Sequence, residues 1–392
     1  MDAIGSVPAK STADAYRKLE AVRSELTRIQ IKNQFPYFYA TSLTWLLRWL
    51  LTERFHLTQA DFLNLVGRGG SNISLKIEKH FRAIAQKINS LPAVAEDIRR
   101  HPAAEMQNRL PPRLVADIRD VIRLYGCRSR HRSLYIKRWA EDPDEVLSII
   151  HRLVLHGVPL EPAADENRSK PHLPFWLGPL ISTTQRFLDL REDLRFLLDR
   201  CLFLLRQSLL LVGEKTGLGD RVFFLSSAEL SDYLLEEGDK EKIESLADQR
   251  RDQFLNSAEA STFIVDGFPA DEFPAEDHIF KGIGSSPGQV TGCARVVEDP
   301  TQSNFEKGDI LIAKNTDPGW TPILSIVGGM VMEEGGLLNH CSIVARELGI
   351  PSVVGVEHAT RRIPDGATVH LDGGRGVIRI VDPTSTPGNQ NK

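Results

Sequence analysis

The sequence predicts a multidomain α and α/β protein, mainly helical over residues 1–265 and mixed α/β over residues 282–381. Its 392 residues exceed what one hydrophobic core usually serves, so two or three domains are expected. Apolar residues recur at helical spacing in the first part, whereas short β-rich runs separated by turn residues fill the second. Residues 266–281 are acidic and contain proline, which predicts an interdomain linker or hinge.

Composition and charge exclude several classes of function. The chain is 41% hydrophobic and 26% charged, with a formal net charge of −4, so neither nucleic acid nor an anionic membrane is indicated as a partner. Its four cysteines are widely spaced and form no CxxC pair, which argues against a zinc site or a disulfide framework. We therefore expect no metal on this chain and a reducing, cytoplasmic setting.

Two patterns predict the principal helices of the first part. Residues 195–213 are apolar on most sides and end in a glycine, as a central helix does. Near the N-terminus, apolar residues recur at spacings of three and four and make one stripe: Leu19, Val22, Leu26 and Ile29.

The run 43–51 is the most apolar one near the N-terminus. It is too short to span a bilayer and contains Arg48, so it predicts a buried helix. No basic segment precedes an apolar one at the start, and we expect no signal peptide. Residues 157–179 are rich in proline and charge, which predicts a long loop of the kind that often carries function.

The last part alternates short strands and helices. Two short helices are predicted at 321–327 and 341–348, and the tail 382–392 is expected to be disordered. Strands are predicted at 290–297, 309–314, 329–334 and 352–356, with a hairpin over 367–381 that turns near Asp372.

His340 stands between a glycine pair and the start of a short helix. Asn339 is a good N-cap residue, and Gly335 and Gly336 let the backbone approach a ligand without a Cβ in the way. The free N–H groups and positive end of such a helix favour a phosphate, and neutral imidazole is a competent nucleophile near pH 7. From this pattern alone, a phosphate site and a histidine that merely packs or caps remain open alternatives.

The stretch 328-GGMVMEEGGLLNHCSIVARELGIPSVVG-355 resembles the active-site signature of the phosphoenolpyruvate-utilising enzymes. The likeness extends over residues 282–381 and implies a C-terminal β/β/α swivelling domain in which His340 is transiently phosphorylated. Asn339 and Cys341 differ from the residues that usually flank the histidine in this family. Cys341 is a second candidate nucleophile, but a small packing residue is the favoured interpretation.

A second resemblance joins residues 125–147 and 191–230 to the central acceptor-binding domain of the rifampin phosphotransferases. It implies that residues 1–265 form an acceptor-binding domain. Arg128 and Arg138 are the candidates for holding the transferred phosphoryl group, with His131 as a possible general base. A solvated basic face or internal ion pairs is the alternative for these residues.

Two further residues are predicted at the edge of the histidine site. The resemblance suggests that Thr316 and Trp320 line it, whereas a plain turn with a packed tryptophan is the alternative. Trp139, Phe175 and Trp176 would suit a phenol or another hydrophobic acceptor, although such residues are more often core.

No nucleotide-binding pattern is apparent in the sequence. The resemblance to the phosphoenolpyruvate-utilising enzymes, which carry an ATP-grasp domain, therefore implies a split dikinase, in which a separate ATP-grasp subunit binds ATP and Mg²⁺ and phosphorylates His340. The phosphoryl group would then pass to a hydroxyl of a small organic acceptor, a phenol or an alcohol. The alternative is a phosphohistidine carrier or regulatory binding protein without a small-molecule acceptor.

Overall fold

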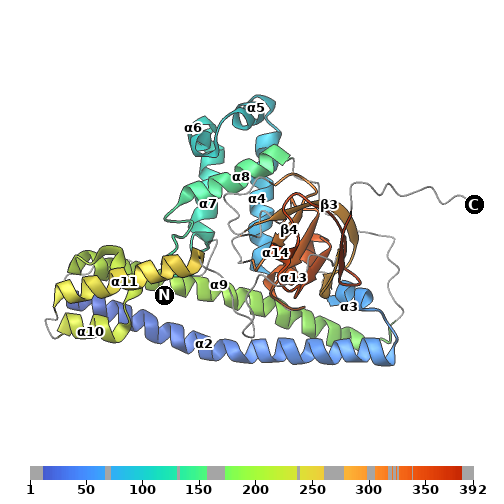
Figure 1. The fold of residues 1–392 in the computed structure, drawn as a ribbon, viewed down its shortest axis with the longest axis horizontal. Coiled ribbons are helices and arrows are strands. Elements are labelled where there is room, and N and C mark those ends of the chain that lie inside the picture. The colour runs from blue at the N-terminus through green and yellow to red at the C-terminus, as the bar shows by residue number, and fades with distance from the viewer. Residues whose placement is uncertain are drawn as a thin grey trace, which may run out of the picture. The chain divides into compact units, whose positions relative to one another are not determined.

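The computed structural model describes most of the chain (Figure 1). Two compact units are built from interleaved segments, and each is described by itself below. The first comprises Met1–Lys32, Arg132–Lys137 and Leu197–Pro274, and the second comprises Asn33–His131, Arg138–Phe196 and Ala275–Lys392. The described residues are 12–66, 72–129, 133–156, 173–235, 239–259, 278–297, 305–316, 320, 324, 326–337 and 339–381.

The first unit is helical. It contains the beginning of α2 (Thr12–Trp49) and the end of α9 (Leu177–Thr216), followed by η3 (Gly219–Phe224), α10 (Ser227–Leu235) and α11 (Lys240–Glu259). Its core joins the predicted N-terminal stripe of α2 to apolar residues of α9, which confirms both predicted helices. The buried members of this core are Ala15, Leu19, Val22, Leu205, Leu209, Val212, Leu218, Val222 and Leu230.

The helical part of the second unit begins with the rest of α2. It continues through η1 (Leu50–Arg54), α3 (Gln59–Val66), α4 (Ile73–Asn89), α5 (Pro92–Arg100), η2 (Ala103–Glu105), α6 (Met106–Arg109), α7 (Pro112–Tyr125), α8 (Pro143–His156) and the start of α9. Helix α4 places Ile77, Phe81 and Ile84 on one face, at the spacing of an amphipathic helix, and this face packs against α7 and α8.

The α/β part of the second unit is an eight-stranded mixed sheet in the order β1-β8-β7-β3-β4-β5-β6-β2. Strands β3 to β6 are parallel neighbours, whereas the outer pairs are antiparallel. Helix α13 (His340–Leu348) lies against β2, β6 and α4, and α14 (Ala359–Arg362) lies against β4. The strands are β1 (Ile279–Lys281), β2 (Ile283–Ser286), β3 (Gln289–Val296), β4 (Ile310–Ala313), β5 (Gly329–Met332), β6 (Ser352–Val354), β7 (Thr368–Asp372) and β8 (Val377–Ile380).

The predicted elements of this sheet are found, with two additions. All four predicted strands and the hairpin of β7 and β8 are present, and α13 fills the predicted helix at 341–348. Strands β1 and β2 were not predicted, because each has only three or four residues and is defined by its pairing with β8 or β6. Most of the helix predicted at 321–327 and the whole tail 382–392 lie outside the described residues.

The linker and loop predictions fall largely outside the described chain. Residues 266–277 of the linker are not described, and Ile279–Lys281 at its end form β1. For the loop predicted over 157–179, only residues 173–179 are described, and α9 already begins at Leu177. The division into domains along the sequence therefore stays a prediction.

One prediction about the helical part is wrong. The run 43–51 lies in α2 and η1 and is only half-buried, since Leu47 and Leu51 are in the core whereas Trp45, Leu46 and Trp49 are exposed. The helix is apolar on two faces, and only one of them meets the rest of the second unit. Within the described chain, no helix combines the length and apolar character needed to cross a membrane.

Candidate functional site

His340 is the first residue of α13, as the sequence predicts. Asn339 precedes it in the extended conformation of an N-cap residue, and Gly349 ends the helix with a left-handed backbone at φ 68°. The Ser342 hydroxyl donates to the carbonyl of Gly336 at 2.8 Å, which ties the first turn of the helix to the glycine pair. The turn therefore fixes the imidazole at the beginning of the helix, where backbone N–H groups favour negative charge.

Asn339 occupies the predicted N-cap position, but its side chain makes no hydrogen bond to the helix, so the expected side-chain cap is not formed. Gly335 explains where this side chain goes. Its φ of 126° suits glycine, and a Cβ there would lie 2.5 Å from Nδ2 of Asn339. The Asn339 amide therefore packs over Gly335 rather than turning back onto the helix. Gly336 has open space where its Cβ would be, so packing does not require glycine at this position.

A buried carboxylate holds the His340 ring. Nδ1 of His340 lies 2.7 Å from Oε2 of Glu192, and the two side chains are 2% and 1% exposed. Glu192 comes from α9, 148 positions away in the sequence. A carboxylate at this distance accepts a hydrogen bond from Nδ1–H, so the neutral ring carries its reactive lone pair on Nε2. This arrangement selects one tautomer and one orientation of the imidazole.

Burial and neighbouring charges set the protonation of this pair. Burial lowers the pKa of His340, and the charges of Arg195 and Arg128 act in the same direction against Glu192. For Glu192, burial opposes ionisation, but His340 and the guanidinium groups of Arg195 and Arg191 outweigh it and lower the pKa of the carboxyl far below its usual range. The pair is therefore an ionised carboxylate beside an imidazole that stays neutral to unusually low pH.

Arginines surround the pair from several elements. Arg128 is buried over the ring of Phe196, with 5.0 Å from its guanidinium carbon to the ring centre. Arg191 lies in the same way over Tyr37 at 5.2 Å, and Nη1 of Arg195 approaches Oε1 of Glu192 at 3.9 Å. Aromatic stacking and a carboxylate contact help to hold these cations in place.

A further arginine, Arg346, comes from α13 itself. It donates to the carbonyl of Ser285 at 2.9 Å, and burial lowers the pKa of this guanidinium to about 10. The charge of Arg191 also acts on Arg346. Closer to the pair, the charges of Arg128 and Arg195 act on His340, and those of Arg191 and Arg195 act on Glu192, so cationic groups contribute to the surroundings of the pair.

Cys341, Thr316 and Trp320 complete the apolar side of the site. Burial raises the pKa of the Cys341 thiol, although hydrogen bonds with Ser342 and Thr316 oppose it. A thiol with a raised pKa is a poor nucleophile, so the structure favours Cys341 as a packing residue. Thr316 and Trp320 are buried, and Trp320 belongs to the core that α13 shares with the sheet.

The described residues contain no group of three or more His, Cys, Asp or Glu side chains that could hold a metal ion. The charged groups at His340 are mainly guanidinium groups, which bind phosphate and carboxylate rather than cations. The chemistry of this site is therefore that of an anion held beside a nucleophilic nitrogen.

Comparison with known proteins adds to this geometry. Residues 305–376 match the family described as PEP-utilising enzyme, mobile domain. This part of the chain is therefore similar to the mobile domain of the PEP-utilising enzymes. Residues 33–207 match the rifampicin phosphotransferase fourth domain, so His340 stands in the mobile domain and Glu192 in the helical segment of the second match. Both resemblances predicted from the sequence are confirmed.

Relatives with these domains are mostly longer proteins. A rifampicin phosphotransferase of Streptomyces sviceus is 32% identical over 220 residues, which are 52% of this chain and 24% of that protein. The uncharacterised phosphotransferase YvkC of Bacillus subtilis is 25% identical over 419 residues, covering 95% of this chain and 49% of its own length. A phosphoenolpyruvate synthase of Aeropyrum pernix is 44% identical over 108 residues, 27% of this chain and 13% of that protein. The matches thus span about half or less of these relatives.

The other predicted site residues lie in different surroundings. Arg138 is buried and donates from Nη1 to the hydroxyl of Ser129, while its backbone N–H donates to Glu141. Arg128 and Arg138 are therefore not a solvated basic face. His131 lies outside the described residues, so its role as general base stays a prediction.

The three aromatic residues considered for an acceptor pocket have other places. Trp139 is a core residue, packed edge-on against Phe81, and donates from Nε1 to Glu145 at 3.1 Å. Phe175 is exposed, and Trp176 lies against Phe55. None of the three lines a described cavity with His340, so they do not indicate an acceptor.

Sequence reasoning missed Glu192, Arg191, Arg195 and Arg346. The signal for three of them is the charged run 191-REDLR-195 inside the long helix α9, whose neighbouring turns are strongly apolar. A charged side chain that falls on the apolar face of such a helix is buried, and buried charges mark chemistry or ion pairs.

Proposed function

We propose that this protein is a phosphotransferase in which His340 receives a phosphoryl group and passes it to a hydroxyl of a small organic acceptor. The observation that carries the proposal is the buried contact of His340 with Glu192, with the charges of Arg128 and Arg195 acting on the ring. The membership of residues 305–376 in the mobile-domain family supports the same chemistry. The proposed mechanism is covalent catalysis, which divides one transfer into two easier steps.

In the first step, the lone pair on Nε2 of His340 forms a bond to phosphorus while the bond between phosphorus and the donor oxygen breaks. The electron pair leaves with that oxygen. Nδ1–H stays hydrogen-bonded to Glu192, which stabilises the positive charge that develops on the ring. In the second step, the acceptor oxygen attacks phosphorus, the N–P bond breaks and His340 is restored. The acceptor proton passes to a base, for which His131 is the candidate.

The arginines stabilise the charge on the transferred group. Negative charge lies on the equatorial oxygens of the phosphoryl group in the transition state, and fixed guanidinium groups lower its energy. Arg128 and Arg195, whose charges act directly on His340, are best placed for this role. Gly335, Gly336 and the first N–H groups of α13 are proposed to contact the phosphoryl group, with Asn339, Thr316 and Trp320 around them.

The donor is proposed to be ATP, bound with Mg²⁺ on a separate ATP-grasp subunit. His340 would displace AMP from the β-phosphorus and take up the β,γ-diphosphoryl group, and water would then release the γ-phosphoryl group as inorganic phosphate. ATP, water and the acceptor would thus give AMP, inorganic phosphate and a phosphoester, with the β-phosphoryl group passing through His340. Residues 282–381 would move as the swivelling domain, with 266–281 as the hinge. Residues 1–265 would hold the acceptor, an alcohol or a phenol, and the reaction would take place in the cytoplasm.

Phosphorylation of His340 is the decisive test. The chain is incubated with the ATP-grasp candidate and [β-³²P]ATP, and the expected result is an acid-labile, base-stable label on the chain. The His340→Ala variant should carry no label, whereas Cys341→Ala should still carry it. Addition of alcohols and phenols should then drain the label into a phosphoester.

Four other outcomes would contradict parts of the proposal. If an ATP-grasp partner that phosphorylates another mobile domain does not label this chain, ATP is not the donor. If [³²P]phosphoenolpyruvate labels the chain instead, phosphoenolpyruvate is the donor. A label that no acceptor drains would favour the phosphocarrier. A label that persists in His340→Ala would overturn the assignment of the nucleophile.

A further inference from the structure

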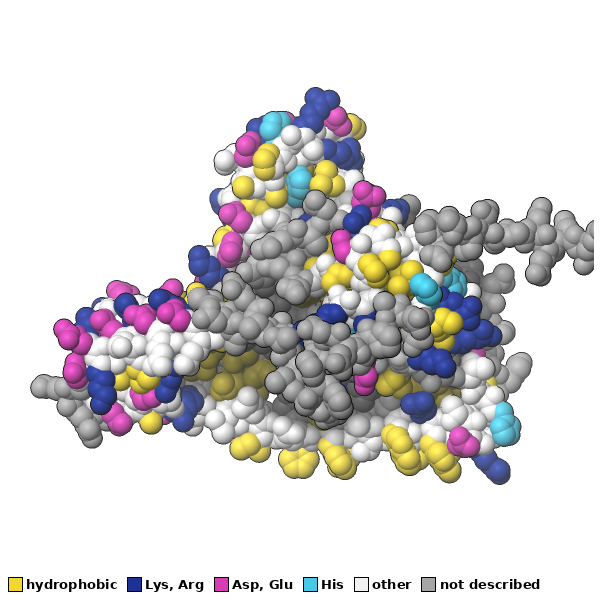
Figure 2. Space-filling model, viewed as in Figure 1, with side chains coloured by type: hydrophobic (Ala, Val, Ile, Leu, Met, Phe, Trp, Pro, Cys, Tyr) yellow, Lys and Arg dark blue, Asp and Glu magenta, His cyan; other side chains and the backbone are white. Residues whose placement is uncertain are grey.

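The outer face of α2 carries large apolar side chains that are exposed to solvent. Phe35 and Phe38 are each 66% exposed, Trp45 is 68% exposed and Trp49 is 49% exposed. Figure 2 shows hydrophobic side chains gathered along the lower edge of the molecule, where α2 runs in Figure 1. We call Phe35, Phe38, Ser42, Trp45 and Trp49 the outer stripe.

The outer stripe is not the face by which α2 packs into its own unit. Ala40, Leu47 and Leu51 form that inner face, and they are fully buried against α3 and the start of α9. The outer stripe lies on the opposite side of the helix, so the core gains nothing from its aromatic rings. Exposed rings without a packing role point to a partner.

The size of this surface matches an interface. An aromatic side chain presents roughly 150–250 Å², so the exposed parts of the stripe, with Tyr39 and Leu46 beside it, amount to roughly 600–700 Å². The largest apolar patch of a typical monomer is about 300–600 Å², and a stable interface buries about 800 Å² on each partner. The outer stripe is therefore large enough to form most of one side of a dimer.

The spacing of the stripe fits a second copy of the same helix. Its members follow one another at intervals of three, four, three and four residues, which is the pattern of a two-helix seam. When the stripe is followed in the opposite direction, its intervals of three and four residues still alternate. The side chains of two antiparallel stripes can therefore interdigitate. Phe35 then faces Trp45 of the other copy, which stacks two aromatic rings, and Phe38 faces the small Ser42, which leaves room for its ring.

The charge of the stripe also suits an identical partner. Residues 33–52 contain a single charged side chain, Arg48, so like surfaces meet with little repulsion. In the antiparallel pairing, the two Arg48 positions lie roughly 24 Å apart along the helices at 1.5 Å per residue. This exceeds the screening length of about 8 Å at physiological salt. Neither an acidic nor a basic partner is indicated.

We propose that α2 is the homodimerisation helix of this protein, pairing antiparallel with α2 of a second copy through the outer stripe. The two-fold axis passes near the level of Ala40, and each copy contributes the same rings to the other. The proposal does not depend on phosphoryl transfer, since His340 and Glu192 take no part in the stripe.

Sedimentation equilibrium of the full chain tests the proposal. The wild type should be a dimer at micromolar concentration, and Trp45→Glu should raise the dimer dissociation constant by about 100-fold or more, because it buries an unpaired charge against Phe35 of the other copy, once in each half of the seam. Phe175→Glu is the matched control: it makes the same kind of change at a ring that is 93% exposed but lies off the stripe, and it should leave the dimer intact. The thermal unfolding midpoint of the Trp45→Glu monomer, compared with wild type diluted below its dissociation constant, checks that the fold is retained.

Several outcomes would overturn the proposal. A wild type that stays monomeric up to 100-fold higher concentration would do so, as would a Trp45→Glu variant that dimerises like wild type. Equal loss of dimer in Phe175→Glu would place the interface elsewhere. Binding of the monomeric wild type to phosphatidylcholine vesicles, lost in Trp45→Glu, would assign the stripe to a lipid surface instead.

Discussion

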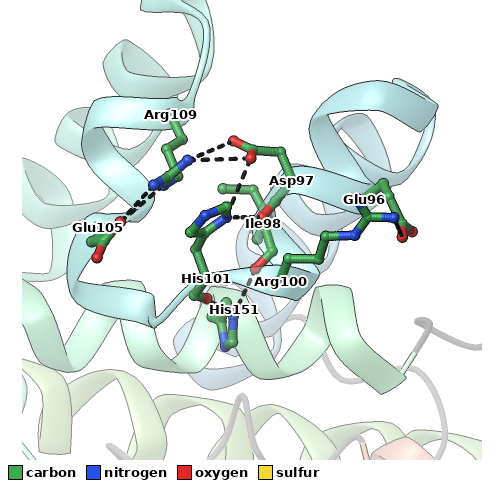
Figure 3. Close-up of polar contacts among 8 residues, drawn as sticks. All are labelled: Glu96, Asp97, Ile98, Arg100, His101, Glu105, Arg109 and His151. Carbon is green, nitrogen blue, oxygen red and sulfur yellow. Dashed lines mark hydrogen bonds and ion pairs between the residues drawn. The ribbon is translucent and has the colours of Figure 1, made fainter.

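Two charged clusters in the second unit differ in burial. Around His340, the central pair with Glu192 is almost fully buried, and the charges of neighbouring arginines act on it. In the other cluster, at α5, η2, α6 and α8, acids and bases alternate near the surface (Figure 3). There Arg109 lies 2.6 Å from Glu105 and 3.2 Å from Asp97, and His101 lies 3.2 Å from Asp97.

This difference in burial distinguishes a candidate functional site from an ordinary cluster of surface ion pairs. Exposed, balanced ion pairs contribute little to stability, and a charge change there is screened by water. Buried charged groups are costly to fold, and buried groups with strongly shifted pKa values cluster at functional sites. The two histidines differ in the same way: the side chain of His101 is partly exposed, whereas that of His340 is buried against Glu192.

Glu192→Gln should have the largest effect of the substitutions that compare the two clusters. The amide keeps the shape but no longer stabilises the imidazolium-like charge or selects the tautomer, so the rate of His340 phosphorylation should fall by about 100-fold or more. Rapid-quench labelling with the charging partner measures it. Glu105→Gln in the surface cluster is the matched control and should label at the wild-type rate; equal losses in both variants would refute a specific role for Glu192.

Arg195→Gln should lower the rate of transfer by about 10-fold, because it removes one of several cations that stabilise the phosphoryl group. Arg109→Gln makes the same change in the surface cluster and should leave the rate unchanged. Single-turnover transfer from phosphorylated chain to acceptor is the measurement. If Arg195→Gln transfers as fast as wild type, its charge serves folding rather than catalysis.

The pH dependence of labelling sharpens the comparison of the two histidine environments. An ordinary histidine with a pKa of about 6.5 loses about three quarters of its neutral form at pH 6. Because burial lowers the pKa of His340, its neutral form persists, and the rate should hold at pH 6 and fall only at lower pH. Glu192→Gln removes the carboxylate that raises the pKa of His340, so in this variant the fall in labelling rate should begin at a still lower pH. A wild-type rate that halves near pH 6.5 would contradict the lowered pKa.

His151→Phe should have the smallest effect on function. Nε2 of His151 donates to the carbonyls of Ile98 and His101, both at 3.0 Å, and so closes the end of α5. Loss of these bonds should lower the free energy of unfolding by about 1–2 kcal/mol, measured by urea denaturation, without changing labelling. A loss of labelling at unchanged stability would mean that this cluster communicates with His340.

Local sequence determined a large part of this protein. The stripe that includes Leu19, the α13 helix from His340 to Gly349 and the hairpin near Asp372 each follow from the order of neighbouring residues. The signature around His340 also identified the family, because nucleophile, glycine pair and helix start lie within one short segment. Such features need no knowledge of distant contacts.

Tertiary structure decided the rest. Glu192 reaches His340 across 148 positions, and nothing local to either residue announces the contact. The strands β1 and β2 exist only through their partners in the sheet. The side chain of Asn339 packs over Gly335, which has no Cβ, instead of hydrogen-bonding to the helix. In α2, the sequence makes two apolar faces, but burial depends on which of them meets a neighbour, and only the inner face does so within the described chain. Periodicity fixes which residues share a face, whereas the free energy of burial depends on what the fold brings against that face.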